Sequence, residues 1–200
     1  MTSATRTPES TTATNSTAAQ RSCAGVPEIV LRRPQVDDGA RMWEIARDSH
    51  VLDVNSSYAY VLWCADHHRT SLVAEVDGRV AGFVTGYIRP DHPQALMIWQ
   101  IAVDAEARGL GIAANMLDHL MTSVSGIGIV GLTNSSAGYG NSTVTEMHTT
   151  ISPDNSASVA LFTSLAQRRE MTITRGDFLD AGLFPGDHEP EDLYILRPAS

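Results

Sequence analysis

Hydrophobic and polar residues follow regular patterns along most of the chain after residue 26. Short apolar or alternating runs predict strands, at 28–33, 70–76, 79–88, 95–103, 144–151 and 192–196. Apolar residues at helical spacing predict helices, at about 38–48, 58–67, 110–122 and 156–167. Strands and helices in this mixed order favour an α/β (α+β) architecture, a mixed sheet with helices on its faces.

Local signals sharpen three of these boundaries. Pro34 stops the first strand, because the residue before a proline favours extended backbone and the proline cannot continue the pairing. Asp37 or Asp38 is placed to cap the helix that follows. Asp77-Gly78 between two apolar runs predicts a tight hairpin turn, since both residues tolerate positive φ.

Two segments depart from the pattern. Residues 1–26 are rich in Ser, Thr and Ala and have no apolar run, so we expect a disordered tail rather than a secretory signal; a plastid-type transit peptide is a minor alternative. Residues 27–200 are then expected to form a single domain. Within it, 123–143 is an atypically long connection with an apolar run that the pattern does not explain.

Composition excludes several classes of function. The net charge of −9 leaves no basic stripe for nucleic acid, and no apolar stretch has the length of a membrane span. The acidic surface either steers a cationic substrate or only keeps the protein soluble. Two cysteines, Cys23 and Cys64, provide neither a disulfide framework nor a metal cluster, so we expect a cytoplasmic protein without a metal.

The segment 100–121 carries the clearest chemistry. An apolar run ends at Val103, and an amphipathic helix follows a glycine-bearing loop made of Arg108, Gly109, Leu110, Gly111, Ile112 and Ala113. Free amide groups at the start of a helix bind anions, and glycines let a phosphate approach closely. The loop therefore predicts a site for a diphosphate, although a plain glycine-rich helix start remains an alternative.

Two kinds of diphosphate ligand fit the spacing. The residues from Gly109 to Ala114 match the dinucleotide pattern G-x-G-x-x-A, but that motif follows the first strand of its unit and needs an acid about twenty residues later. No acid occurs between Ser125 and Asn141. The spacing Arg108-x-x-Gly111-x-Ala113 instead resembles the coenzyme A loop of the GCN5-related N-acetyltransferases (GNAT).

The GNAT resemblance implies a fold and a coenzyme site. It implies about six to seven strands and about four helices, with the fourth and fifth strands splayed around the pantetheine arm of acetyl-CoA. The coenzyme-binding backbone would then include Ile101, Ala102 and Val103, one of whose amides would stabilise the carbonyl oxygen. Without the resemblance, these residues read equally well as sheet core.

A second GNAT motif is similar to residues 151–162. Asn155 occupies the position that holds pantetheine in many members, but an N-cap role explains it equally well. The tyrosine that protonates the departing sulfur in many members is replaced here by Phe162. This difference implies that the thiolate leaves unassisted or takes a proton from water.

Five segments in order narrow the resemblance to the diaminobutyrate acetyltransferases of ectoine biosynthesis, over about 29–196. They are 52–60, 83–87, 98–103, 149–155 and 186–191. The resemblance implies transfer of the acetyl group from acetyl-CoA to the γ-amino group of L-2,4-diaminobutyrate, a step in osmoprotection. It also implies a homodimer located in the cytoplasm. Another amine acceptor, or a coenzyme A sensor without activity, remains an alternative.

Candidate residues for the diamine follow from this resemblance. The candidates for substrate binding are Asp53, Asn55, Ser56, Tyr58 and Trp99, of which the first four lie on a short irregular segment. Structural roles compete with this interpretation: Asp53 as a helix cap, and Tyr58 and Trp99 as core aromatics.

A base is also needed, because an alkylammonium group with a pKa of ~10 is protonated at neutral pH. Glu191 and His188 in the acidic segment near the C-terminus are the first candidates, followed by Asp53 and Glu75. The alternative is that this segment is a solvated loop without a catalytic role.

Overall fold

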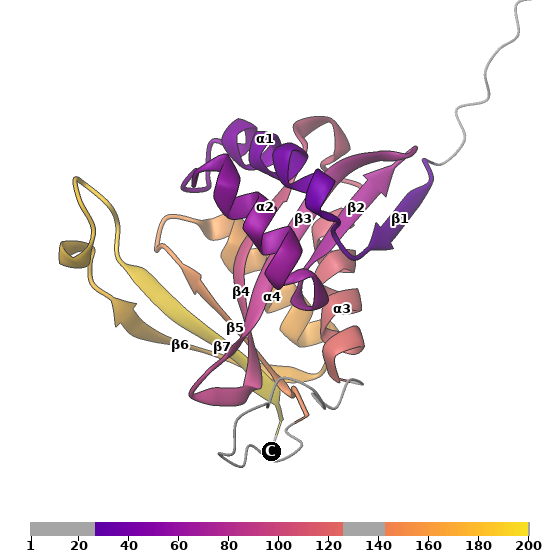
Figure 1. The fold of residues 1–200 in the computed structure, drawn as a ribbon. Helices are drawn as coiled ribbons and strands as arrows, with labels where there is room; N and C mark the ends of the chain where they lie inside the picture. The colour runs from indigo at the N-terminus through magenta and orange to yellow at the C-terminus, as the bar shows by residue number, and fades with distance from the viewer. Residues whose placement is uncertain (1–26, 126–142, 200) are drawn as a thin grey trace, which may run out of the picture.

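The computed structural model describes residues 27–125 and 143–199, and these form a mixed α/β structure around one sheet (Figure 1). The expected tail and most of the connection 123–143 lie outside the described residues. The sheet order is β1-β2-β3-β4-β5-β7-β6, and every neighbouring pair is antiparallel except β4–β5. The strands are β1 Ile29–Arg32, β2 Leu72–Val76, β3 Arg79–Arg89, β4 His92–Val103, β5 Glu146–Ile151, β6 Met171–Leu179 and β7 Glu191–Pro198.

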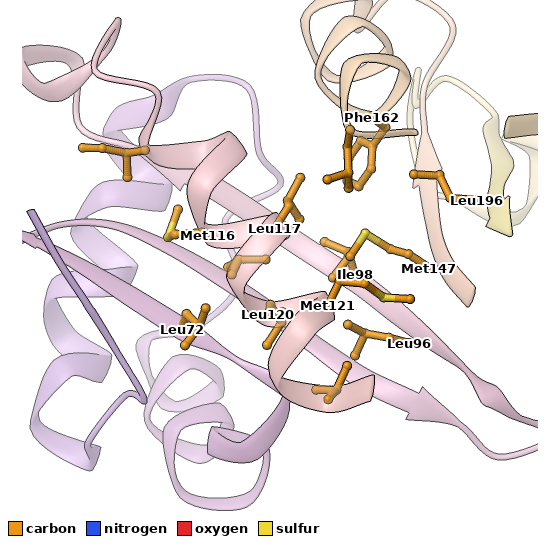
Figure 2. Close-up of a cluster of buried hydrophobic side chains, with 14 of the residues drawn as sticks. Leu72, Leu96, Ile98, Met116, Leu117, Leu120, Met121, Met147, Phe162 and Leu196 are labelled. Atoms are coloured by element: carbon orange, nitrogen blue, oxygen red, sulfur yellow. The ribbon is translucent and has the colours of Figure 1, made fainter. Parts of the chain in front are cut away.

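Helices cover both faces of the sheet. They are α1 Gly39–Ser49, α2 Ser57–Asp66, α3 Ile112–Ser125 and α4 Ser156–Arg168, with 3-10 turns η1 Val36–Asp38, η2 His68–Thr70, η3 Ala105–Ala107 and η4 Ala181–Leu183. One core lies between the sheet and α1 and α2, around Tyr60 and Phe83. The larger core lies under α3 and α4, where Leu117, Leu120 and Phe162 are almost fully buried (Figure 2).

The predicted hairpin is confirmed. Asp77 and Gly78 connect β2 to β3 with φ values of 50° and 81°, the left-handed conformation that a two-residue turn requires. Asp38 does precede α1, but its side chain makes no capping bond to the helix. Its carboxylate instead binds the Arg32 guanidinium at 2.6 Å and the Gln35 amide at 2.7 Å, which ties the helix start to the edge strand.

The pattern of apolar and polar residues did not predict strand β6. Most of its residues are exposed, because β6 is an edge strand that pairs only with β7. Its second half contains Arg175, Gly176 and Asp177, so the alternation of apolar and polar residues stops after Ile173. An edge strand needs little apolar surface, which is why the pattern does not reveal it.

Strands β4 and β5 separate along their length, as the resemblance implied. Only Ala95–Ile98 of β4 pairs with β5, opposite Glu146–Thr149, whereas β4 continues to Val103. The register between β3 and β4 also shifts at this point: Thr85 pairs with Gln100 and Gly86 with Ile98, which leaves Trp99 as an extra residue. Such a bulge bends a strand and redirects its side chains.

Candidate active site

A cleft of about 400 Å³ opens where β4 and β5 part. Its walls come from the connection between α1 and α2, from β4, β5 and the start of α4, and from β6, β7 and the loop between them. A volume of this size suits a small metabolite together with the reacting end of a larger ligand. The separation of the two strands therefore creates the main candidate site.

The bulge in β4 fixes one wall of the cleft. The Trp99 ring stacks on Trp63 of α2 with ring centroids 4.2 Å apart. The neighbouring Gln100 is buried, and its Nε2 donates to the Asp53 carbonyl oxygen at 2.9 Å. The α1–α2 connection is thereby attached to the strand at the point where the strand leaves its partner.

Asp53 and His188 meet at the mouth of the cleft although they are 135 residues apart. His188 Nε2 lies 2.9 Å from Asp53 Oδ2, and its ring stacks on Phe184 with centroids 4.1 Å apart. The hydrogen bond to Asp53 raises the pKa of His188 above its ordinary value, because the carboxylate stabilises the imidazolium.

Glu191 is the first residue of β7 and lines the same cleft. Burial raises the pKa of its carboxyl group, since a half-buried carboxylate loses hydration. A hydrogen bond from Thr150 and the charge of His188 act in the opposite direction without cancelling the effect. Glu191 is therefore a stronger base than an ordinary surface glutamate.

Replacing Asp53 with asparagine tests the link between these side chains. We expect Asp53→Asn to lower the pKa of His188 towards its ordinary value of ~6.5, because the amide cannot stabilise the imidazolium. The ion pair requires a protonated His188 ring, so it is lost as pH rises through the raised pKa of His188. An NMR titration of the His188 ring measures this shift, with Asp187→Asn as the control; equal titration curves for the Asp53→Asn variant and the parent would contradict the contact.

The loop before α3 has the geometry expected of an anion site. Gly109 and Gly111 have φ values of 82° and 73°, which residues with a Cβ rarely adopt. The helix begins at Ile112, and the Asn115 amide donates to the Gly111 carbonyl oxygen at 3.0 Å. The amides of the first turn have no acceptor within the helix, so they are available for a diphosphate.

The start of α4 forms the opposite side of the cleft. Asn155 caps this helix, and its Oδ1 accepts from the Ser158 amide at 3.0 Å. Asn155, Ser158 and Phe162 lie on one face of α4 and all line the cleft. The capping role of Asn155 is therefore real, and it leaves the Nδ2 group of the side chain for a ligand.

Comparison with known proteins agrees with this geometry. The sequence model of the acetyltransferase (GNAT) family matches residues 39–137. An L-2,4-diaminobutyric acid acetyltransferase of Nocardia farcinica is 47% identical over 169 residues, which cover 84% of this chain and 80% of the relative. The corresponding enzyme of Marinococcus halophilus is 36% identical over 168 residues, which cover 84% of this chain and 88% of the relative. The chain belongs to the diaminobutyrate acetyltransferases of the GNAT family.

A solved structure leads to the same family, and a second one shares only the fold. The diaminobutyrate acetyltransferase EctA of Paenibacillus lautus, solved with L-2,4-diaminobutyric acid and coenzyme A, superimposes with a TM-score of 0.73 at 36% identity. The match covers 86% of this chain and 96% of EctA. A ribosomal-protein-S18-alanine N-acetyltransferase of Escherichia coli shares the fold, with a TM-score of 0.61 at 16% identity over 86% of this chain and 93% of that one. The dinucleotide alternative for the glycine loop is wrong: the loop follows β4 of a GNAT sheet.

The structure brings together most of the residues predicted for the site. The predicted residues that line the cleft are Asp53, Asn55, Trp99, Ile101, Asn155, Phe162, His188 and Glu191. Ser56 and Tyr58 are exposed outside this lining, and Glu75 binds Arg32 instead. Ala102 packs in the core under α1 and α2, and Val103 lines a separate hollow with Arg108. The roles assigned to all these residues remain predictions.

Several cleft residues were not predicted. Gln100, Phe178, Leu179 and Phe184 line the cleft. Gln100 belongs to the segment 98–103 that carries the resemblance but was given no role, and no sequence motif distinguishes the other three. The bulge that redirects Gln100 depends on the pairing of β4 with β3, which lies outside the local pattern. The one available signal was the position of Gln100 within the segment 98–103.

Two further properties concern only the described part of the chain. None of the helices there is long and apolar enough to cross a membrane. Among residues 27–125 and 143–199, no three His, Cys, Asp or Glu side chains are grouped so that they could hold a metal ion.

Proposed function

We propose that this protein transfers the acetyl group of acetyl-CoA to the γ-amino group of L-2,4-diaminobutyrate, the step that supplies the precursor of ectoine. The observation that carries the proposal is the cleft between β4 and β5, which holds Asp53, His188 and Glu191 together at its mouth. Carboxylates suit a substrate with two ammonium groups, and the opening between the strands suits the pantetheine arm.

Glu191 is assigned as the base. A diamine arrives protonated, and its γ-ammonium must lose a proton before the nitrogen can attack the thioester carbonyl. The raised pKa of Glu191 brings the carboxylate closer to the basicity that proton transfer near neutral pH requires. The hydrogen bond to Asp53 raises the pKa of His188 and so favours its protonated form, which is better suited to orient the two carboxylates than to accept the proton.

Gln100 and Asp53 are assigned to the ammonium groups. Gln100 lines the cleft, and its buried Oε1 has no hydrogen-bond partner among the described residues. Its Nε2 donates to the Asp53 carbonyl, so the amide orientation is set and the oxygen is left as an acceptor. A buried acceptor without a partner costs about 1–3 kcal/mol, which an incoming ammonium would recover.

Backbone amides of β4 are assigned to the developing oxyanion. Beyond Ile98 no described residue of β5 pairs with β4, so amide groups of the segment from Ile101 to Val103 that point to this side are free to face a bound thioester. The Gln100 amide is excluded, because it donates to Thr85 Oγ1 at 3.2 Å. Preorganised amides stabilise the tetrahedral intermediate without a dedicated side chain. The Phe162 ring cannot donate a proton, so the thiolate leaves with a proton from water or as the anion.

Product analysis tests the proposed function. Purified protein with acetyl-CoA and L-2,4-diaminobutyrate should form a product heavier by one acetyl group, and fragmentation should place this group on the γ-nitrogen. Side-by-side rates with ornithine, lysine and a polyamine identify the preferred acceptor. Acetylation at the α-nitrogen, or a faster reaction with another amine, would contradict the proposal.

The same proposal places the enzyme in the cytoplasm, as a homodimer, in the response to osmotic stress. The free cysteine Cys64 is buried 3.4 Å from the Met42 sulfur, which suits a reducing compartment. The homodimer rests on the family resemblance, and light scattering of the purified protein measures it directly.

A further inference from the structure

A row of contacting side chains crosses one side of the sheet next to the cleft. Glu146 Oε2 lies 2.9 Å from His148 Nε2, and His148 Nδ1 lies 3.0 Å from an Arg89 Nη1 atom. The Arg89 guanidinium lies over the Phe178 ring, 5.5 Å from its centroid. Phe178 lines the cleft, so this row of side chains ends at the cleft wall.

The hydrogen bonds among Arg89, His148 and Glu146 allow only one assignment of donors and acceptors. A guanidinium can only donate, so Nδ1 of His148 must accept from Arg89. The single ring proton then sits on Nε2 and is donated to the Glu146 carboxylate. His148 is 3% exposed, and burial lowers its pKa, which agrees with a neutral ring. Arg89 is thus held in place by a buried histidine whose two ring nitrogens are both paired.

The contact between Arg89 and Phe178 joins distant parts of the sheet. Arg89 belongs to β3 and Phe178 to β6, which are four strand spacings apart in the sheet order. In a flat sheet their backbones would be about 19 Å apart. The two side chains meet because the sheet curves around the cleft, and they bridge its two halves where only four residue pairs join β4 to β5.

The bridge lies at one end of the cleft. Alternate residues of a strand share a face, so His148 lies on the same face of β5 as Thr150. Arg89 lies two residues after Tyr87 on β3 and reaches this face through its contact with His148. Tyr87 and Thr150 line the cleft, and the bridge continues the same face just beyond them. The register of β6 and β7 shifts between Gly176 and Leu179, which places Phe178 in a bulge.

We propose that the bridge between Arg89 and Phe178 closes this end of the cleft and sets the length of the diamine that the enzyme accepts. The inference rests on the proposed function, which supplies the diamine. Phe178 is the wall that the substrate meets. Arg89 is a positioning residue: it acts through Phe178, and His148 and Glu146 hold it there.

Relative rates on diamines of increasing length test the proposal. kcat/KM is measured with L-2,4-diaminobutyrate, ornithine and lysine for the parent, Phe178→Ala, Arg89→Met and the double variant. Phe178→Ala should raise the ratio of ornithine to diaminobutyrate about 10-fold, the discrimination that one methylene group commonly provides. Arg89→Met should raise it less, and the double variant should match Phe178→Ala, because Arg89 acts only through the ring.

Controls separate this role from a general loss of structure. Arg168→Met removes a guanidinium that binds Asp118 on α3, away from the cleft, and should leave the ratio unchanged. Thermal melts with and without acetyl-CoA show whether each variant folds and binds, and Phe178→Leu replaces Phe178→Ala if the latter does not fold. Unchanged ratios in folded Phe178 and Arg89 variants, or additive effects in the double variant, would overturn the proposal.

Failure of the proposed function gives a different result. If the parent does not acetylate diaminobutyrate but acetylates another amine, the proposed acceptor is wrong. The bridge is then tested with the same variants on amines that differ from that acceptor by one or more methylene groups. If the parent acetylates diaminobutyrate and the ratios do not move, only the bridge is wrong.

Discussion

Glu191→Gln should lower kcat/KM for the diamine by about 10²–10⁴-fold, the range typical of losing a general base. The amide keeps the shape of the side chain but cannot accept a proton from the ammonium group. Steady-state rates with saturating acetyl-CoA measure the loss. Glu189→Gln is a matched control two residues away, because Glu189 is exposed and outside the cleft lining, and it should keep nearly full activity.

The pH dependence gives an independent check on Glu191. Burial raises the pKa of this carboxyl group, so the protonated, inactive form persists to a higher pH than for an ordinary glutamate. Activity of the parent should therefore rise with pH as Glu191 ionises. The Glu191→Gln variant should lack this part of the profile, and a variant with unaltered kcat/KM and the same profile would remove Glu191 from the role of base.

Phe162→Ala should lower the free energy of unfolding by about 3–5 kcal/mol, the usual cost of removing a fully buried aromatic ring. Phe162 is 1% exposed and packs in the core formed by α3, α4 and the sheet (Figure 2). The ring also lines the cleft, so the cavity would open towards the coenzyme site. Urea unfolding with an unchanged m-value measures the loss.

An exposed leucine provides the comparison for Phe162. Leu183 in η4 is 68% exposed, and Leu183→Ala should change the free energy of unfolding by less than ~0.5 kcal/mol. A Phe162→Ala protein as stable as the Leu183→Ala protein would show that the ring does not hold the two helices on the sheet.

Sequence patterns were sufficient to predict those parts of the fold whose conformation depends on neighbouring residues. The left-handed glycines at 109 and 111, the turn at Asp77-Gly78 and the start of α4 after Asn155 each depend on a few neighbouring residues. Hydrophobic periodicity likewise located the buried faces of α3, because helical spacing alone determines which of its residues face the sheet.

The site depends on contacts that span the chain, and these were less accessible. Asp53 and His188 were each singled out, but nothing local indicated that they form a hydrogen bond across 135 residues. The bulge at Trp99 depends on β3, and the position of Phe178 depends on a strand whose exposed residues gave no signal. Residues that act through such pairings become visible only once the sheet is assembled.

The opening between β4 and β5 has a consequence for the protein without its ligand. The end of β4 then presents unpaired backbone groups inside the molecule, much like the outer rim of a sheet, which is prone to join other strands. A thioester carrier that lies along this rim would shield it from such misassembly. The concentration of the acyl donor would then determine how well the enzyme resists aggregation, as well as how fast it turns over.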